Sequence, residues 1–383
     1  MSRESNPSTR PVGIAVLGLG AMGIGHARRL AAGLVDGARL AAVVDRNPDR
    51  RAAFAVPGFA DLDQLFAAAA AEAVLVATPH RDHVASGIAV IDADWHLLME
   101  KPLAPTVAEA QTLLAAARRR RAGQVLAIGL NQRSDPRHRA LRDLLRSGVC
   151  GAVQRIAWCA TDWFRTGAYF ASAPWRGTWQ GEGGGLLINQ CPHQLDLWCW
   201  LFGLPERVTA DLACGRWHAI EVEDEVAAIL SHAGGPIGTF TASTGEMPGI
   251  NRLEIACDRG LVTLDDSGLR WARTPSARSI RDHCPDPMPC IAGEMVLVAP
   301  AAPGFDQHAA LQADFAHAIR SGGEPLAPLA DGLASLALAN AILAAGVLGR
   351  SIRLPLDPDL LAEAMRALAA AGKPTVAHPA AAR

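Results

Sequence analysis

The chain has 383 residues, of which 50% are apolar and 19% are charged, and its formal net charge is -2 at pH 7. This length allows two domains with substantial cores. The near-neutral charge gives no electrostatic reason to expect a nucleic acid or a membrane surface as a partner. The first eleven residues are polar, so we expect no signal peptide, and no uninterrupted apolar run reaches the roughly 18 residues of a membrane span. We therefore expect a soluble, cytoplasmic protein.

The eight cysteines are scattered and include no Cys-x-x-Cys pair. Without a signal peptide, reduced and mostly buried thiols are the default. His283, Cys284 and Cys290 lie close together in a Pro-rich segment, but three candidate ligands do not make a zinc site. We therefore expect no bound metal.

The most informative pattern lies near the N-terminus. A short apolar run at 13–17 leads into Gly18-Leu19-Gly20-Ala21-Met22-Gly23, and a helical pattern follows through Leu30. This order predicts a buried strand, a tight turn and a helix start. In the spacing Gly-x-Gly-x-x-Gly the glycines permit the turn, the approach of a pyrophosphate and close helix–strand packing. The helix N-terminus favours phosphate. A glycine-rich turn without a ligand is the alternative.

A second predicted strand, 38–44, ends on Asp45, which lies 22 residues after Gly23. An acidic side chain at this place accepts hydrogen bonds from the adenosine ribose and repels a 2′-phosphate. The pattern therefore predicts a bound dinucleotide and favours NAD over NADP. Arg46 offers a contact to a 2′-phosphate, so NADP stays an alternative.

Helices and strands then alternate as far as residue 130. We expect helices at 61–70, 83–91 and 106–121 and strands at 73–77, 95–99 and 125–130. This alternation implies right-handed βαβ units and a doubly wound parallel sheet, with ligands at the carboxyl ends of the strands. Thr78, Lys101 and Asn131 all fall at such strand ends, beside the glycine turn.

The character of the chain changes after Arg133. We expect a helix at 137–147, a strand at 153–160, an irregular stretch at 162–185 and a helix through Leu201. Short β-rich runs at 207–217, 223–232, 237–245, 251–257 and 260–265 indicate a mainly antiparallel meander. We expect a loop at 274–304, helices at 306–320, 330–348 and 358–371, and an extended piece at 352–354.

The predicted fold is an α/β Rossmann domain plus an α+β domain with an open, mainly antiparallel sheet. We expect a flexible N-terminus at 1–11, the NAD(P)-binding Rossmann domain at 12–132, the substrate and oligomerisation domain at 133–372 and a flexible tail at 373–383.

Glu100-Lys101-Pro102 stands where a predicted strand of the cofactor domain ends. Lys101 is one of two lysines among 36 basic residues, the other being Lys373. A chain that uses Arg almost everywhere else has Lys here, which indicates that Arg would not serve. Lys has a compact ammonium whose pKa can fall on burial, so it can take part in proton transfer. The alternative is a surface lysine beside a turn proline.

A second candidate segment, 183–196, begins with three glycines, which allow the backbone to pass close to a ligand. Asn189 and His193 are four residues apart, so on a helical turn they share a face. Pro192 suits the first turn of the following helix, although it can break regular geometry just before His193. Histidine suits general acid/base work near neutral pH. The alternative is a structural histidine packed against the tryptophans of that helix.

Together these motifs resemble the Gfo/Idh/MocA family, which includes glucose–fructose oxidoreductase and inositol dehydrogenase. The resemblance covers about 12–356 and lies in the glycine motif with His26, Asp45, Thr78-Pro79, Glu100-Lys101-Pro102, Trp175-Arg176, Gly183-Gly184-Gly185 through His193, and Asp196. It implies NAD(P)-dependent oxidation or reduction at a hydroxyl-bearing carbon of a sugar or cyclitol. It also implies that Lys101 hydrogen-bonds the reacting oxygen and that His193 takes or returns its proton.

The candidate cofactor-binding residues are Gly18, Gly20, Ala21, Met22, Gly23, Asp45, Arg46, Thr78, Pro79, His80, His83, Glu100, Lys101 and Asn131. The chain departs from the family at two of its candidate positions. Many members have Asp where this chain has Asn189, and an amide orients a hydroxyl but cannot relay a proton. Acid/base duty should therefore fall more heavily on His193 and Lys101. His80 stands where Asn is common, which would alter contacts near the nicotinamide ribose, unless it is a solvated loop histidine.

An aromatic and basic segment precedes the three glycines. Aromatic faces pack on the C–H faces of sugar rings, and Arg binds hydroxyls or an acidic substituent. The candidate substrate-binding residues are Trp163, Arg165, Trp175, Arg176, Trp179 and Asn189. As alternatives, the tryptophans are core or interface anchors, and the arginines pair with Glu182 or Asp162.

The leading hypothesis is an NAD-dependent dehydrogenase of a sugar, glycoside or cyclitol. The resemblance also implies a homo-oligomer, a dimer or tetramer, because family members commonly associate through the open face of the second-domain sheet. Two alternatives stay open. One is an enzyme that cleaves glycosides by transient oxidation and elimination with bound NAD, and the other is a dinucleotide-binding sensor without catalysis.

Overall fold

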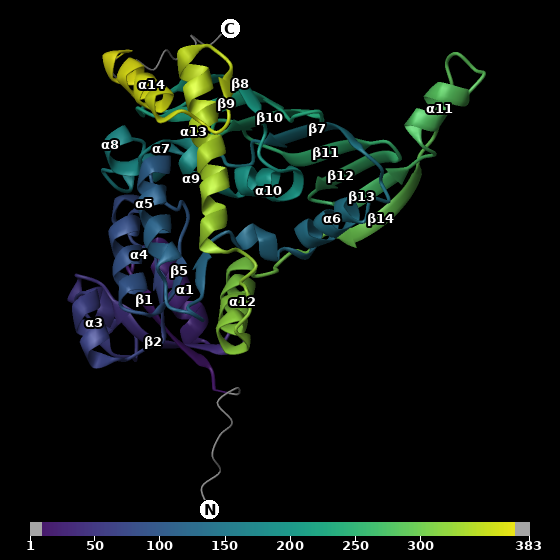
Figure 1. The fold of residues 1–383 in the computed structure, drawn as a ribbon. Helices are drawn as coiled ribbons and strands as arrows, with labels where there is room; N and C mark the ends of the chain where they lie inside the picture. The colour runs from purple at the N-terminus through teal and green to yellow at the C-terminus, as the bar shows by residue number, and fades with distance from the viewer. Residues whose placement is uncertain (1–9, 372–383) are drawn as a thin grey trace, which may run out of the picture. The chain divides into compact units, whose positions relative to one another are not determined.

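The computed structural model describes residues 10–371, so the predicted tail at 373–383 and most of the predicted segment 1–11 lie outside the described residues. The chain divides into two units (Figure 1). The first contains residues up to Ser134 together with Asp306–Leu336, and the second contains Asp135–Phe305 and the residues from Ala337 onward. The predicted boundary at 132 and 133 treats the domains as successive, whereas the segment Asp306–Leu336 clusters with the N-terminal unit.

The first unit contains a six-stranded sheet with the order β3-β2-β1-β4-β5-β6, in which every neighbouring pair is parallel. Its strands are β1 (Val12–Leu17), β2 (Ala38–Val44), β3 (Gly58–Phe59), β4 (Ala73–Val76), β5 (His96–Met99) and β6 (Leu126–Ile128). The strands are almost wholly buried because helices cover both faces, as in other parallel sheets. The predicted Rossmann fold is confirmed, and the strand order reverses between β1 and β4, where such sheets bind ligands.

The helices of this unit follow the predicted βαβ pattern. They are α1 (Ala21–Ala31), α2 (Pro48–Ala52), α3 (Leu62–Ala68), α4 (His83–Asp92), α5 (Val107–Arg118) and α12 (Gln307–Ser321), with short 3-10 turns η2 (His80–Asp82), η3 (Asn131–Ser134) and η4 (Leu329–Asp331). Side chains of Asp61 and Thr106 cap α3 and α5. The short elements α2 and β3 were not predicted. Helix α12 comes from late in the chain and contacts α1, β1 and β2.

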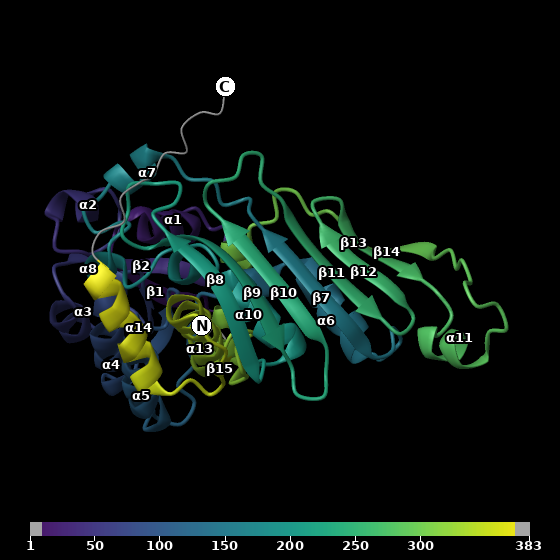
Figure 2. The same ribbon diagram turned by 90° about the horizontal axis from the view of Figure 1, so that it is seen from above.

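The second unit is built on a nine-stranded sheet with the order β14-β13-β12-β11-β7-β10-β9-β8-β15 (Figure 2). Only the pair β7–β10 is parallel, which confirms the mainly antiparallel prediction. The strands are β7 (Val153–Ala160), β8 (Arg207–Cys214), β9 (Glu223–Ser231), β10 (Ile237–Ser243), β11 (Asn251–Cys257), β12 (Gly260–Asp265), β13 (Gly268–Arg273), β14 (Glu294–Pro300) and β15 (Ile352–Arg353). Burial alternates along β9 and β10, so one face of the sheet packs on the core and the other carries exposed Ile229 and Ile237.

Helices α6 and α10 lie against one face of this sheet (Figures 1 and 2). The helices of the unit are α6 (Pro136–Arg146), α7 (Gly167–Ala171), α8 (Trp179–Glu182), α9 (Leu186–Asn189), α10 (Pro192–Phe202), α11 (Ala277–His283), most of α13 (Gly332–Leu348) and α14 (Pro358–Ala371). Trp198 of α10 is fully buried and packs against β10. The contact is so close that a side chain in place of Gly238 would collide with the indole ring.

Two local predictions for this unit were wrong. The segment 274–304 is not a loop, because it contains α11, capped by Ser276, and the edge strand β14, which pairs with β13. The helix expected from the glycines through Leu201 is broken at Gln190 and Cys191, since Pro192 starts a new helix, α10. The irregular stretch 162–185 contains the short helices α7 and α8.

One stretch of the described chain, Leu329–Leu348, is a helix of sufficient length and apolar composition to cross a membrane. The sequence criterion of an uninterrupted apolar run missed it because Asp331, Ser335 and Asn340 interrupt the run. Most of this helix is buried inside the fold, including Leu338 and Ile342. It is therefore a core helix.

Candidate functional site

The turn between β1 and α1 has the geometry that a pyrophosphate site requires. Gly18 has φ +88°, and a Cβ there would lie 2.8 Å from the carbonyl oxygen of Ala77. A Cβ at Gly23 would collide with the carbonyl oxygen of Gly18, so α1 packs tightly on the turn. Gly20 is the N-cap of α1 and has no side chain to accept a hydrogen bond from the first backbone N–H groups, and a Cβ there would meet nothing within 4 Å. The uncapped helix terminus thus faces open space into which a phosphate fits.

Asp45, at the end of β2, connects that strand to the glycine turn. Its Oδ2 atom accepts a 2.6 Å hydrogen bond from Leu19 N, and its Oδ1 atom accepts one of 2.8 Å from Asn47 N. A carboxylate has about four acceptor positions, so ribose hydroxyls can still be bound. Arg50, which sequence reasoning missed, lies 3.9 Å from Asp45 Oδ2, and Arg46 is exposed. Arg51 Nη1 donates a 2.6 Å hydrogen bond to the Asp45 carbonyl oxygen, so arginines at 46, 50 and 51 surround the acidic residue at the predicted adenosine-ribose position.

Two candidate residues at other strand ends offer buried polar atoms. Thr78 follows β4 and Asn131 opens η3 after β6. The Thr78 hydroxyl and the Asn131 Oδ1 atom are buried and have no hydrogen-bond partner within the described residues. Asn131 Nδ2 donates to Gln307 of α12 at 3.1 Å. Buried polar atoms of this kind are normally satisfied, so both fit hydrogen bonding to a ligand.

His83 occupies a structural position between two loops of the predicted cofactor site. Its Nδ1 atom lies 2.7 Å from the Pro102 carbonyl oxygen and its Nε2 atom 3.0 Å from the Thr78 carbonyl oxygen. Burial lowers the pKa of His83 and outweighs these acceptors and the nearby charges of Glu100 and Asp82. The ring of His80, in η2 after Pro79, packs edge-on against it at 5.7 Å.

Glu100 is buried at the end of β5 and bonds to a histidine far away in sequence. Its Oε1 atom accepts a 2.7 Å hydrogen bond from His26 Nε2, and its Oε2 atom accepts one of 3.1 Å from Lys101 N. Gln312 of α12 hydrogen-bonds the other ring nitrogen of His26. Burial alone would raise the pKa of Glu100, but the His26 hydrogen bond and the charges of His26 and Lys101 lower it to about 2. Glu100 is therefore ionised, and it fixes the backbone from which the half-buried Lys101 projects.

In the second unit, a buried carboxylate holds the glycine segment. Glu223 of β9 accepts 3.0 Å hydrogen bonds from the backbone N–H groups of Gly185 and Leu187. A Cβ at Gly185 would collide with the Glu223 carbonyl oxygen, which explains why glycine is needed there. Burial raises the pKa of Glu223 to about 7, although these backbone donors act in the opposite direction.

Asn189 and His193 lie on different helices, so they do not share a continuous helical face as expected. Asn189 ends α9, and half-buried His193 stands in the first turn of α10. Asn189 Nδ2 donates to Tyr169 Oη at 3.3 Å and also hydrogen-bonds Glu182. Sequence reasoning missed Tyr169, although it is the single tyrosine of the chain and lies between two candidate arginines.

The candidate arginines stack on aromatic rings. The guanidinium carbon of Arg176 lies 4.3 Å from the ring centre of Tyr169 and 4.5 Å from that of Trp175. The guanidinium carbon of Arg165 lies 5.0 Å from the ring centre of Tyr169 and 5.5 Å from that of Trp163. Trp179 starts α8 and is half-buried.

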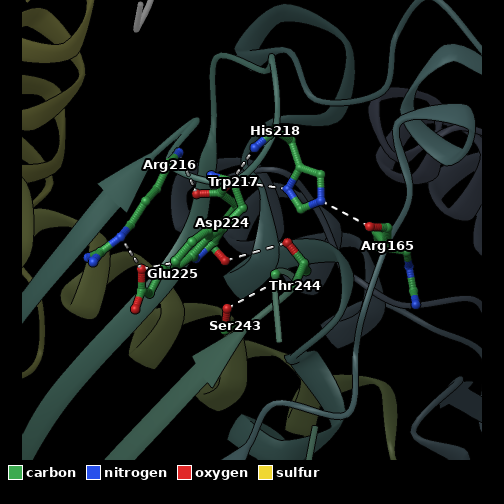
Figure 3. Close-up of polar contacts among 9 residues, drawn as sticks. Arg165, Arg216, Trp217, His218, Asp224, Glu225, Ser243 and Thr244 are labelled. Carbon is green, nitrogen blue, oxygen red and sulfur yellow. Dashed lines mark hydrogen bonds and ion pairs between the residues drawn. The ribbon is translucent and has the colours of Figure 1, made fainter. Parts of the chain in front are cut away.

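A histidine–aspartate pair close to this segment was also missed (Figure 3). His218 Nδ1 lies 3.1 Å from Asp224 Oδ2, and His218 Nε2 lies 3.0 Å from the Arg165 carbonyl oxygen. Burial alone would lower the pKa of His218, but the Asp224 carboxylate and the carbonyl raise it. Both ring nitrogens face acceptors, so the protonated ring can donate to both.

The second unit contains a cavity of about 620 Å³ beside these residues. Its lining includes the aromatic side chains of Phe170 and Trp217, together with Arg176, His218 and Glu221. Of the predicted substrate-binding residues, Arg176 lines this cavity. The others named above do not.

Within residues 10–371, no group of three or more His, Cys, Asp and Glu side chains could hold a metal ion. All eight cysteines are free thiols.

Comparisons with known proteins agree with both units. Residues 12–129 match the family model described as "Oxidoreductase family, NAD-binding Rossmann fold" and residues 138–263 match the "GFO/IDH/MocA C-terminal domain". Inositol 2-dehydrogenase of Streptomyces avermitilis is 32% identical over 267 residues, which are 67% of this chain and 73% of that protein. Inositol 2-dehydrogenase 2 of Paenarthrobacter aurescens is 28% identical over 269 residues, 68% of this chain and 77% of that protein.

A crystal structure of the WlbA dehydrogenase from Bordetella pertussis, in complex with NADH and UDP-GlcNAcA, has a similar fold. It is 26% identical and superposes with a TM-score of 0.73, covering 91% of this chain and all of that one.

Proposed function

Because the chain belongs to the Gfo/Idh/MocA oxidoreductase family, we propose that it is an NAD-dependent dehydrogenase of a sugar, glycoside or cyclitol. It would transfer a hydride between the nicotinamide and a hydroxyl-bearing carbon. The names of its relatives, inositol 2-dehydrogenases, and the sugar nucleotide bound by WlbA support this substrate class. One observation carries the proposal. Gly20, Asp45 and Lys101 follow β1, β2 and β5 at the carboxyl edge of one parallel sheet.

The cofactor-binding residues have separate tasks. The uncapped α1 terminus at Gly20 binds the pyrophosphate, and Asp45 accepts hydrogen bonds from the adenosine ribose. Thr78 and Asn131 use their buried oxygen atoms for the nicotinamide half. Met22, exposed in the first turn of α1, adds apolar contact. Bound NAD supplies the hydride acceptor in the oxidation direction.

Proton handling is assigned to Lys101 and His193. The Lys101 ammonium hydrogen-bonds the reacting oxygen and stabilises negative charge that develops there. His193 takes the hydroxyl proton in oxidation and returns it in reduction. Asn189 orients a substrate hydroxyl but carries no proton, because an amide does not titrate in this range. Trp163, Arg165, Trp175, Arg176 and Trp179 are assigned to the substrate.

The test is NADH formation, followed by its near-ultraviolet absorbance, with NAD and then NADP across a panel of sugars, glycosides and inositols. We expect NADH formation that is lost in His193→Ala while NAD still binds. Cleaved glycoside without net NADH would instead identify a glycoside-cleaving enzyme. Cofactor binding without turnover across the panel would identify a dinucleotide-binding sensor.

We further infer a cytoplasmic homo-oligomer, a dimer or tetramer, that associates through the open face of the nine-stranded sheet. Exposed Ile229 and Ile237, 48% and 61% exposed, lie on that face and give it apolar character. Light scattering after size exclusion tests the oligomer, and Ile229→Lys should shift it toward the monomer. An unchanged mass would contradict this interface.

A further inference from the structure

Arg165 and Arg176 place two guanidinium groups around one aromatic ring, that of Tyr169. The guanidinium carbons lie 5.0 and 4.3 Å from its centre. Arg176 Nη1 also donates a 2.6 Å hydrogen bond to Tyr169 Oη, and Asn189 donates to the same oxygen at 3.3 Å. The two cations are therefore fixed beside the residue that we assign to orienting the substrate.

Among the described residues, neither arginine forms a close ion pair with a carboxylate. Within residues 10–371, no carboxylate oxygen lies within 4.0 Å of either guanidinium, whereas Arg155 and Arg252 of the same unit both pair with Glu254. Arg165 Nη1 donates to two backbone carbonyls, those of Trp163 and Phe164. The Nε atoms of both arginines are buried and have no hydrogen-bond partner in this described part of the chain.

Carboxylates of this region have other partners. Glu182 accepts a 2.7 Å hydrogen bond from Gly177 N and a further one from Asn189. Asp224 accepts from the backbone N–H groups of Arg216, Trp217 and His218 and from the His218 ring (Figure 3). Asp162 accepts from Asn251 at 3.3 Å. Neither arginine lies within ion-pair distance of Glu182 or Asp162 in the described part of the chain. Burial raises the pKa of Asp162, and the charge of Arg165 acts in the opposite direction, so these two side chains still interact electrostatically.

The cavity described above is lined by Arg176 but not by Arg165, whose backbone carbonyl lies 3.0 Å from His218 Nε2 of the lining. Arg176 lines it together with the flat rings of Phe170 and Trp217. His218 lines it too, and its raised pKa favours the protonated ring. A ligand in the cavity would meet aromatic faces, which suit the C–H faces of a sugar ring. It would also meet the cationic donors of Arg176 and His218, which suit an anion, and the side chain of Glu221 on the same lining.

We propose that Arg165 and Arg176 bind a carboxylate of the substrate, so that the dehydrogenase prefers a sugar acid over the corresponding neutral sugar. This assignment rests on the proposed dehydrogenase function. Guanidinium is the side chain that binds a carboxylate through two parallel N–H bonds, and unlike Lys it stays charged when half-buried.

The test compares matched acid and neutral substrates with NAD: D-glucuronate with D-glucose, and D-galacturonate with D-galactose. We expect a higher kcat/KM for the acid of each pair in the wild type. In Arg176→Gln and Arg165→Gln this acid-to-neutral ratio should fall about 10- to 100-fold, the usual effect of losing a charged hydrogen bond. The matched control is Arg155→Gln, which removes an arginine of the same unit that pairs with Glu254. The acid-to-neutral ratio of kcat/KM in Arg155→Gln should equal that of the wild type.

A binding measurement separates this inference from the proposed function. Tryptophan fluorescence in the presence of NADH reports whether D-glucuronate or D-glucose binds, even if neither is turned over. Tighter binding of D-glucuronate that Arg176→Gln weakens supports the carboxylate site, with or without turnover. Equal binding of acid and sugar, or an equal loss of both in Arg176→Gln, overturns it. Absence of NADH formation with any substrate would count against the dehydrogenase alone.

Discussion

His26 and Glu100 are 74 positions apart in the sequence, yet their side chains share a buried 2.7 Å hydrogen bond in the first unit. His26 belongs to α1, directly after the glycine turn, and Glu100 precedes Lys101 at the end of β5. The bond therefore ties the helix proposed to receive the pyrophosphate to the strand that presents the proposed catalytic lysine. Because Glu100 is buried and ionised, its charge should contribute to stability in a pH-dependent way.

We expect Glu100→Gln to lower the free energy of unfolding by roughly 1–3 kcal/mol at neutral pH, the cost of a lost charged hydrogen bond. The pKa of Glu100 is lowered from 4.5 to about 2, so its contribution is complete above pH 4.5 and is lost as pH falls through 2. In urea unfolding, the difference in the free energy of unfolding between wild type and variant should therefore narrow as pH falls from 4.5 to 2. The exposed Glu324→Gln is the control. A gap that is constant with pH would contradict the ionised, paired state.

Glu223 should show the opposite pH dependence. Its pKa is raised from 4.5 to about 7 by burial, so its contribution to stability is complete below pH 4.5 and is lost as pH rises through 7. Ionisation then places a charge in a buried site. In Glu223→Gln this loss should be absent. The free energy of unfolding of the variant, relative to that of the wild type, should therefore rise by up to about 1.4 kcal/mol per pH unit. Urea unfolding at a series of pH values between 4.5 and 7 measures this difference. If the unfolding free energies of wild type and variant change with pH in parallel, Glu223 does not titrate in that interval.

Asp45→Asn should shift the cofactor preference toward NADP. The amide keeps an acceptor for Leu19 N but removes the negative charge, and Arg46 and Arg50 stay beside it. We expect the ratio of kcat/KM for NAD to that for NADP to fall at least about 10-fold, since one charged hydrogen bond is lost and one repulsion removed. Asp49→Asn, exposed in α2, is the matched control. An unchanged ratio would exclude Asp45 from ribose recognition.

The glycines of the turn should respond differently to alanine. Gly23→Ala places its methyl group against the Gly18 carbonyl and should destabilise the protein by about 1–3 kcal/mol. Gly20→Ala places its methyl group in open space at an ordinary φ of -75°, so stability should stay close to that of the wild type while NAD affinity falls. Thermal unfolding and calorimetric titration with NAD measure the two effects. Unchanged NAD affinity in Gly20→Ala would mean that no phosphate approaches this residue.

Local patterns were enough to predict most of the fold. Strands Ala38–Val44 and Val153–Ala160 were predicted at their observed bounds, because buried apolar runs are bounded by turn residues there. The prediction failed at 274–304, where the proline residues are concentrated in the turn between α11 and β14 and concealed both elements. It also failed at Pro192, whose helix-starting preference divides a segment that has helical periodicity throughout.

The residue types of the candidate site were visible in the sequence, but their partners were not. Lys101 and His193 were identified from motifs. The bonds from His26 to Glu100 and from Glu223 to the glycine segment join distant positions, and no local spacing encodes them. Tyr169 could have been noticed as the single tyrosine of the chain. Its role, however, depends on the guanidinium groups of Arg165 and Arg176, which lie next to its ring.

The late origin of helix α12 has a consequence for synthesis of the chain. Gln312 and Asp306 hydrogen-bond His26 and Arg29 of α1, although they are separated from α1 by most of the second unit. The strands β1 to β6 thus belong to a unit that is not complete until residue 336 has been made. A fragment ending at Ser134 would contain the glycine turn but not these partners. The N-terminal unit should therefore reach its final stability only after translation has passed through the whole segment 135–305 and helix α12.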